Sequence, residues 1–273
     1  MDRYAVIGNP VAHSLSPAIH ARFAAQLGER IEYVALLAPL DGFRATVERF
    51  FREGGRGANV TLPFKVEAFE LAAACSERAR EAGAANFLAR RDDGSVAADN
   101  TDGAGLVCDL RDNLGMSIEG ATILMIGAGG AARGVMAPLL AERPARLVIA
   151  NRDAERGRAL ASRFARRGRV ESCALDRIPP LDFGLVVNAT SASTLGMPLA
   201  LGDDSILRPG VVAYDMAYGA NARAFVERAR ARGARACDGL GMLVEQAAES
   251  FRLWRGRRPA TRELIAELRA GPA

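Results

Sequence analysis

Residues 121–134 read A-T-I-L-M-I-G-A-G-G-A-A-R-G, an apolar run that breaks into glycines. A run that is apolar at every position is typical of a strand buried on both faces of a parallel sheet. Gly127, Gly129 and Ala132 fit the pattern G-x-G-x-x-A, whose glycines allow a tight turn and a close approach of the backbone to a pyrophosphate. The stretch therefore predicts a strand, a phosphate-binding turn and a helix that begins beside the phosphate. A glycine-rich turn without a ligand is the alternative.

The end of the next predicted strand, R-L-V-I-A-N at 146–151, indicates which dinucleotide binds. About twenty residues after the glycines, proteins that bind NAD usually carry Asp or Glu for the ribose hydroxyls. This chain has Asn151 and Arg152 there, with Arg156 beyond, and a guanidinium can pair with the 2′-phosphate of NADP. The sequence therefore predicts NADP. Asp153 lies next to these residues, so binding of NAD is not excluded. The alternative for the arginines is that they lie on a solvated helix face.

Strand and helix signals alternate on both sides of this region, which predicts an α/β fold with mostly parallel, helix-covered sheets. Ser16 is expected to cap a helix that has Pro17 in its first position and ends at Gly28. The expected strands lie at 3–9, 31–38, 57–61, 121–126, 146–151, 182–190 and 210–216, and the expected helices include 14–28, 41–55 and 101–115.

The change from short strands to the long apolar run predicts two domains, with a boundary near residue 105. From Gly239 onward only helices are expected, and we expect them to return to the first domain. The expected division is thus 1–105, 106–238 and 239–273.

Composition excludes several classes of protein. The net charge of +4, from 36 Lys or Arg and 32 Asp or Glu, suits anionic ligands, but no basic tail indicates nucleic-acid binding. The four cysteines form no C-x-x-C and only two histidines occur, so neither a metal site nor a disulfide framework is expected. No apolar run could span a membrane and no leader precedes the first strand, so a cytoplasmic protein is expected. A homodimer is compatible with the sequence.

Lys65 is the single lysine, since the other 35 basic residues are arginines. It ends the stretch N-V-T-L-P-F-K at 59–65. An arginine stays protonated at any working pH, whereas an ammonium can release and regain a proton. Lys65 is therefore a candidate for proton transfer, and an accident of composition is the alternative.

Several stretches together resemble the shikimate dehydrogenase family, in family order and over essentially the whole chain. They are G-N-P-V-A-H-S-L-S-P (8–17), G-A-N-V-T-L-P-F-K (57–65), G-A-A-N (83–86), D-N-T-D-G (99–103), the glycine turn, N-A-T-S (188–191), Y-D-M-A-Y (214–218) and D-G-L-G-M-L-V-E-Q-A (238–247).

The resemblance implies the reversible, NADPH-dependent reduction of 3-dehydroshikimate to shikimate, in the pathway to chorismate and the aromatic amino acids. It implies that 1–105 is the substrate-binding and catalytic domain, that 106–238 is a Rossmann-type NADP-binding domain, and that 239–273 completes the first. It also implies that Lys65 and Asp102 are the catalytic pair.

The same resemblance implies the binding residues. Those expected to bind shikimate are Ser14, Ser16, Thr61, Lys65, Asn86, Asp102, Tyr218 and Gln246. Those expected to bind NADP are Gly127, Ala128, Gly129, Gly130, Ala131, Asn151, Arg152, Arg156, Met216, Gly239 and Met242. No metal is expected.

The chain also departs from the family pattern. Ala192, Ser193 and Thr194 intervene before Gly196, and Asp153 replaces a common threonine. A quinate/shikimate dehydrogenase with relaxed substrate and cofactor choice is the nearest alternative. A folate-cycle methylene dehydrogenase of similar architecture lacks the S-x-S and N-T-D-G blocks. A sensor that binds shikimate without turnover is the alternative that is not an enzyme.

Overall fold

The computed structural model describes residues 1–197, 199, 201–202 and 204–271. It divides into two units, one made of Met1–Gly105 with Leu243–Ala273 and the other of Leu106–Met242. Residues 272 and 273, at the end of the expected last segment, lie outside the described residues. In the described part of the chain, every helix is too short or too polar to cross a membrane.

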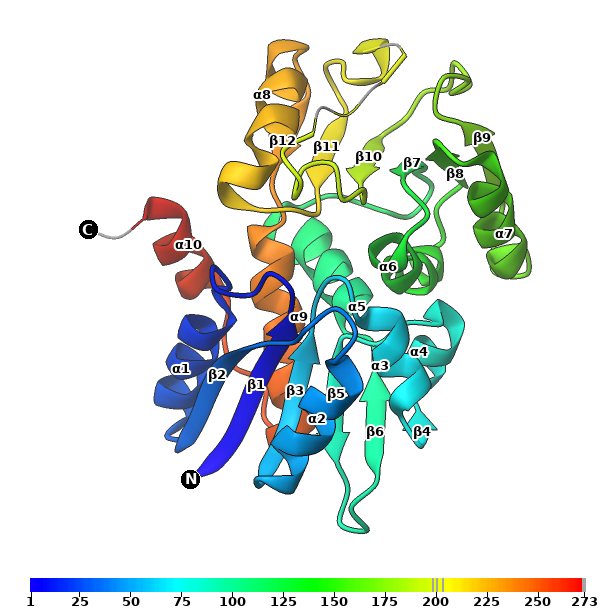
Figure 1. Cartoon of the computed structure of the whole chain (residues 1–273). Helices are drawn as coiled ribbons and strands as arrows, with labels where there is room; N and C mark the ends of the chain where they lie inside the picture. The colour runs from blue at the N-terminus through cyan, green and yellow to red at the C-terminus, as the bar shows by residue number, and fades with distance from the viewer. Residues whose placement is uncertain (198, 200, 203, 272–273) are drawn as a thin grey trace. The chain divides into compact units, whose positions relative to one another are not determined.

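The first unit is built on a mixed six-stranded sheet in the order β2-β1-β3-β5-β6-β4 (Figure 1). Strand β5 runs antiparallel to both of its neighbours, and the other neighbouring strands run parallel. The strands are β1 (Asp2–Gly8), β2 (Ile31–Leu37), β3 (Gly55–Val60), β4 (Ala74–Cys75), β5 (Phe87–Arg90) and β6 (Val96–Asp99). The helices are α1 (Ser16–Leu27), α2 (Phe43–Arg52), α3 (Lys65–Leu71), α4 (Glu77–Ala82), most of α9 (Leu240–Arg255) and α10 (Arg262–Ala270).

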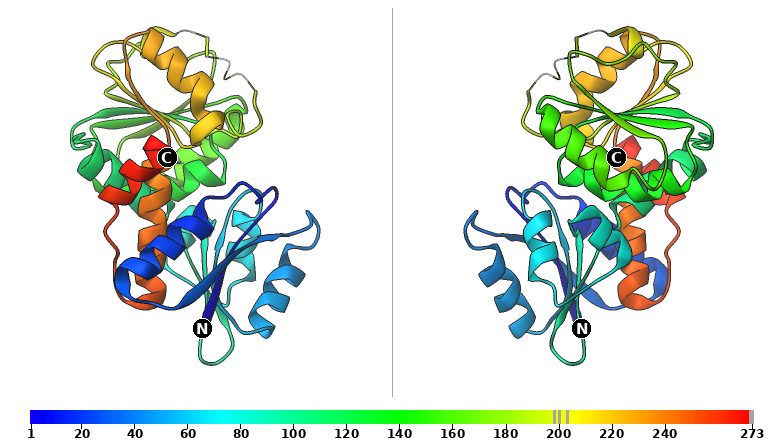
Figure 2. Two further views of the ribbon diagram at one scale, coloured as in Figure 1. Left: turned by 90° about the vertical axis from the view of Figure 1, so that its left-hand side faces the viewer. Right: turned by 90° about the vertical axis from the view of Figure 1, so that its right-hand side faces the viewer.

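Helices cover both faces of this sheet, with α1 and α9 on one face and α2 and α3 on the other (Figure 2). Alternate side chains of β1 point to opposite faces. Ala5 and Ile7 pack in the core that includes α2 and α3, whereas the ring of Tyr4 lies 4.7 Å from that of Trp254 in α9. Trp254 also explains a glycine in β3, because a Cβ at Gly57 would lie 2.1 Å from the indole nitrogen.

The end of the chain belongs to this unit through an apolar cluster. Phe251 of α9 and Leu264 of α10 pack against Ile19 and Phe23 of α1. A helix of this kind is held by its apolar face rather than by its own propensity.

The start of α1 differs from the prediction. Leu15, not Ser16, occupies the N-cap position and makes no side-chain cap bond, while Ser14 Oγ accepts from Ser16 N, the first N–H of the helix, at 3.3 Å. Ser16 is buried and its hydroxyl contacts that of Tyr33, so it is turned away from the first-turn N–H groups. Gly28 ends the helix as predicted, with φ of 68°.

The second unit is built on a fully parallel sheet in the order β12-β11-β10-β7-β8-β9. Its strands are β7 (Thr122–Ile126), β8 (Arg146–Asn151), β9 (Val170–Ala174), β10 (Leu185–Asn188), β11 (Val212–Asp215) and β12 (Arg235–Cys237). Its helices are α5 (Asp102–Cys108, which begins in the first unit), a π-helical turn (Asp109–Asn113), α6 (Gly130–Ala141), α7 (Ala154–Phe164) and α8 (Arg223–Ala231), with 3₁₀ turns at Asp204–Ile206 and Gly219–Ala222.

Strand β7 is apolar from Ile123 to Ile126 because both of its faces are buried. Ile123 and Met125 face the core that contains α6, and Leu124 and Ile126 face the core that contains α8. The chain order reverses direction between β7 and its neighbour β10. In open α/β sheets, ligands bind at the carboxyl ends of the strands at such a point. The expected α/β class with two sheets is confirmed.

Candidate active site

The sheet of the first unit brings predicted site residues to one edge. Thr61 follows β3, and Asn86 precedes the antiparallel β5, so both lie where β3 ends. Asn86 N donates to the Asp99 carbonyl at the end of β6 (3.2 Å), and its own carbonyl accepts from Val60 N (2.8 Å). The backbone therefore fixes the spacing of three loops at this edge.

Lys65 and Asp102 meet at this edge. The Nζ of Lys65 donates to Oδ2 of Asp102 at 2.6 Å, and the two side chains are 15% and 6% exposed. Lys65 is the first residue of α3, and Asp102 is the first residue of α5. The Lys65 carbonyl also accepts from Ala85 N at 2.7 Å, which ties α3 to the segment that carries Asn86.

Asn86 connects this pair to the rest of the site. Its Oδ1 accepts from Thr101 N at 2.7 Å, so the amide orientation is set by a backbone donor. Its Nδ2 consequently faces Oδ1 of Asp102 (2.9 Å), Oγ1 of Thr101 (2.9 Å) and Oε1 of Gln246 (3.2 Å). Four of the predicted substrate-binding residues thus form one hydrogen-bonded group, namely Lys65, Asn86, Asp102 and Gln246.

The sequence did not single out the buried residues behind this group. Ser250 donates to the Gln246 carbonyl (3.0 Å), its oxygen accepts from Asn59 Nδ2 (2.8 Å), and it lies 3.2 Å from Oγ1 of Thr101. Asn59 and Thr101 belong to two of the stretches that resemble the family, 57–65 and 99–103. The only signal for Ser250 was its position one helical turn after Gln246.

The remaining residues expected to bind substrate in the first unit are Ser14, Ser16 and Thr61. Ser14 Oγ accepts from Ser16 N, the first N–H of α1, at 3.3 Å. Thr61 N donates to the Ile7 carbonyl at 2.9 Å, and a Cβ at Gly8 would lie 2.3 Å from Thr61 Cγ2. Gly8 is therefore a close-approach glycine, and it lets the threonine sit against the end of β1.

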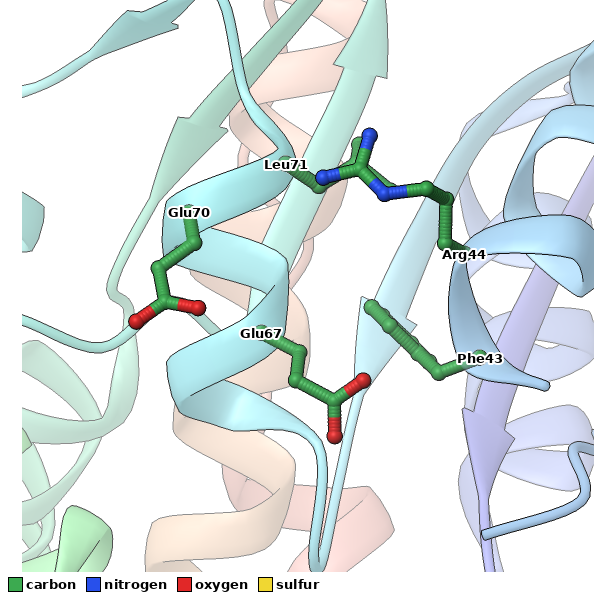
Figure 3. A pocket seen from close by; sticks show the side chains of 5 residues that line it. All are labelled: Phe43, Arg44, Glu67, Glu70 and Leu71. Atoms are coloured by element: carbon green, nitrogen blue, oxygen red, sulfur yellow. The ribbon is translucent and has the colours of Figure 1, made fainter. Parts of the chain in front are cut away.

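A cavity of about 180 Å³ lies between α2 and α3 and contains none of the predicted site residues (Figure 3). Its lining comprises Phe43, Arg44, Glu67, Glu70 and Leu71. The carboxylates of Glu67 and Glu70 would repel an anionic substrate. In the part of the chain that the structure describes, no group of His, Cys, Asp or Glu could hold a metal ion.

The residues expected to bind NADP line one edge of the second sheet, after the carboxyl ends of parallel strands. Gly127, which follows β7, has φ of 110°, which only glycine adopts readily. A Cβ at Gly129 would meet nothing within 4 Å, so space remains beside the helix start. Among the described residues no side chain caps α6. Free N–H groups, an open turn and a positive φ fit a bound pyrophosphate.

Asn151, Arg152 and Arg156 follow β8 at the same edge. Asp153 is the N-cap of α7, and its carboxylate accepts from Glu155 N (3.0 Å) and Arg156 N (3.2 Å). The Arg156 side chain also lies 3.3 Å from Asp153, whereas Arg152 forms no ion pair with the described residues. The helix cap gives the acidic residue a structural role, and Arg152 is the arginine available for a phosphate.

Met216, Tyr218, Gly239 and Met242 complete this edge after β11 and β12. Tyr218 therefore belongs to the second unit, unlike the other residues expected to bind substrate.

The loop that departs from the family pattern is anchored beside them. Ser193 donates to buried Asp215 at 2.6 Å, and Asn188 donates to the same oxygen at 2.8 Å. Burial raises the pKa of Asp215 above its usual value, while these donors oppose the rise.

Comparison with known proteins agrees with this arrangement. The shikimate dehydrogenase (NADP(+)) of Dechloromonas aromatica (strain RCB) is 54% identical over 270 residues, which cover 98% of each chain. The chain belongs to the shikimate dehydrogenase family. The family models matched are the shikimate dehydrogenase substrate binding domain (6–88), shikimate / quinate 5-dehydrogenase (110–197) and the shikimate 5′-dehydrogenase C-terminal domain (239–269).

Solved structures of similar chains have the same fold. The Ael1 enzyme from Pseudomonas putida is 46% identical, with a TM-score of 0.90 and 97% of each chain covered. Shikimate 5-dehydrogenase from Thermus thermophilus, solved in complex with NADP(H) and shikimate, is 32% identical, with a TM-score of 0.81 and 99% of each chain covered. This shikimate dehydrogenase family member thus shares its fold with these chains over at least 97% of its residues.

Proposed function

We propose that Lys65 is the proton-transfer group of this chain and that Asp102 holds it in place. As a member of its family, the chain is an enzyme that oxidises shikimate with NADP and catalyses the reverse reduction. The observation that supports the two roles is the 2.6 Å contact between Lys65 Nζ and Asp102 Oδ2 at an edge that also carries Asn86 and Gln246.

Reduction of a ketone to an alcohol needs a hydride at carbon and a proton at oxygen. NADPH, when bound, supplies the hydride. The Lys65 ammonium donates the proton to the carbonyl oxygen as negative charge develops there, and the neutral amine takes it back in the oxidation. Asn86 Nδ2 and an ammonium are donors only, so both oxygens of Asp102 act as acceptors. Asp102 is then a carboxylate, and the mobile proton is that of Lys65.

Ser14 and Ser16 are proposed to hold the substrate carboxylate. The support is that two hydroxyl groups lie at the N-terminus of α1, and a helix N-terminus favours an anion. Thr61, Asn86, Asp102, Tyr218 and Gln246 are proposed to meet the ring hydroxyls. Hydroxyl, amide and carboxylate groups suit such a ring because they donate and accept in defined directions.

The NADP contacts are proposed along the second edge. Gly127, Ala128, Gly129, Gly130 and Ala131 would face the pyrophosphate, Arg152 with Asn151 and Arg156 would face the 2′-phosphate, and Met216, Gly239 and Met242 would border the nicotinamide. The open space at Gly129 supports this assignment, as does Arg152, whose guanidinium has no ion-pair partner among the described residues. We accordingly propose that the second unit is the cofactor domain.

We also propose a cellular location and an oligomeric state. The four cysteines are reduced thiols, the form that a reducing compartment maintains, and this supports a cytoplasmic location. The homodimer stays a prediction, which sedimentation of the purified chain would test.

Turnover of shikimate and of quinate, each with NADP and with NAD, tests the proposal. We expect efficient reduction of NADP with shikimate and little with quinate. Comparable rates with both substrates would make the chain a relaxed quinate/shikimate dehydrogenase. Binding of shikimate without any reduction of NADP would identify a sensor and contradict the proposal.

A further inference from the structure

A buried carboxylate and a buried phenol, those of Asp109 and Tyr214, lie together in the second unit. The hydroxyl of Tyr214 donates to Asp109 Oδ2 at 2.6 Å, and both residues are fully buried. Burial, with the Asp109 charge beside it, raises the pKa of Tyr214 well above its ordinary value. The phenol is therefore protonated and is the donor of this bond.

The pair reaches the first turn of α9. The oxygen of Tyr214 accepts from Met242 N at 3.3 Å. A Cβ at Gly241 would lie 1.9 Å from Oδ1 of Asp109, so the carboxylate packs directly on the backbone of this turn. The second oxygen of Asp109 is held by Asn113 Nδ2 at 3.0 Å, which fixes the plane of the carboxylate.

The opposite side of the same turn is held by the segment after β11. Gly239 N donates to the Ala217 carbonyl at 2.8 Å, and a Cβ at Gly239 would lie 2.4 Å from the Met216 carbonyl oxygen. Gly239 and Gly241 are therefore each required by a different close contact. One faces Met216, and the other faces Asp109.

We infer that Asp109 and Tyr214 are positioning residues for NADP: they fix the 239–242 turn, which borders the nicotinamide end of the cofactor. This inference rests on the proposed function, because Gly239 and Met242 are assigned there. An apolar pair of similar volume could fill the same space, but it would leave the Met242 N–H without its acceptor. The position of the turn, and not a contact with the cofactor, is what the pair provides.

The variant Tyr214→Phe tests the inference, with NADPH affinity measured by calorimetry in the absence of substrate. We expect binding to weaken about tenfold, the scale of one lost hydrogen bond to a charged group. Asp109→Leu should weaken binding similarly. Asp109→Asn should stay near wild type, since its amide oxygen can still accept from Tyr214 and Asn113 can reverse its own amide. The KM for shikimate should change little in all three variants.

The matched control is Tyr4→Phe, which removes a buried phenol oxygen from the first unit. Unchanged NADPH affinity in Tyr214→Phe and Asp109→Leu, with thermal stability lowered as in the control, would overturn the inference. If Tyr214→Phe does not fold, the contrast between Asp109→Leu and Asp109→Asn gives the same answer. Because calorimetry needs no turnover, the measurement can be repeated in a Lys65→Ala background. The result for Asp109 and Tyr214 therefore does not depend on whether Lys65 transfers the proton.

Discussion

The first residue of α3 and the first residue of α5 form an ion pair, in which Lys65 Nζ donates to Asp102 Oδ2 at 2.6 Å. Each residue is placed by the start of a helix, and the helices themselves are fixed by the ends of β3 and β6. The second oxygen of Asp102 accepts from Asn86. The pair is thus held from both sides by rigid elements, as proton transfer between fixed groups requires.

Cofactor choice should depend on Arg152. Arg152→Ala should weaken NADP binding by at least about tenfold and NAD binding far less, because only NADP offers a 2′-phosphate to a guanidinium. Dissociation constants for both cofactors measure this. Arg158→Ala, an exposed arginine on α7, is the matched control and should change neither. Equal losses for NADP and NAD in Arg152→Ala would mean that Arg152 does not contact the phosphate.

The negative charge of Asp153 should weaken the preference for NADP over NAD, while its carboxylate caps α7. Asp153→Thr keeps a capping hydroxyl and removes an anion, so the preference for NADP over NAD should rise while thermal stability stays near wild type. Asp153→Ala should raise the preference too but cost about 1 kcal/mol of stability, because the cap is lost. The account of Asp153 fails if the threonine variant is as unstable as the alanine variant.

Substrate anchoring should depend on Ser14 and Ser16. Replacing both with Ala should raise the KM for shikimate and leave the affinity for NADP nearly unchanged. Because Ser14 accepts from one N–H of α1, at 3.3 Å, whereas Asp153 accepts from two N–H groups of α7, the double variant should lose less stability than Asp153→Ala. A normal KM combined with a large loss of stability would show that the two serines serve the helix and not the substrate.

His20 should make stability depend on pH. It is fully buried, its ring stacks on that of Tyr33 at 4.1 Å, and burial lowers its pKa to about 3, although nearby Asn59 offsets part of this shift. Between about pH 6.5 and pH 3 the unfolded chain binds a proton that the folded chain does not. Stability that is present above about pH 6.5 is therefore lost as the pH falls, by about 1.4 kcal/mol per pH unit.

The variant His20→Phe should remove this component, which urea unfolding at about pH 7 and about pH 5 would measure. The loss on acidification should be about 2 kcal/mol smaller in His20→Phe than in wild type. His13→Asn, at the exposed second histidine, is the control and should behave as wild type. Identical pH dependence in wild type and His20→Phe would contradict the assignment of a neutral buried imidazole.

The sequence predicted those features that depend on neighbours along the chain. The run at 121–126 could be assigned to a doubly buried strand because four consecutive residues, 123–126, are large and apolar, and Gly28 to a helix end because only glycine adopts its φ readily. The hairpin of β5 and β6 was missed because each strand has only four residues and β6 contains two alanines, which have low β propensity.

Features that depend on distant residues could not be read in this way. Thr101 and Ser250 are 149 positions apart, and only the fold brings their hydroxyls within 3.2 Å. Ser16 carried a capping signal, but its burial against the sheet turned the side chain inward. Tertiary packing overrode local preference there, as it commonly does.

The most direct test of the account is the kcat of Lys65→Arg, measured with shikimate and NADP beside Asp102→Asn and the double variant. The guanidinium keeps the charge but cannot release a proton near neutral pH, and general acid–base help is worth about 10²–10⁴ in rate. We predict that Lys65→Arg loses turnover by at least that order with a much smaller change in KM, and that the double variant is far less than additively impaired, because the two residues act as one unit. Retention of more than about a tenth of the wild-type kcat in Lys65→Arg would contradict proton transfer by Lys65.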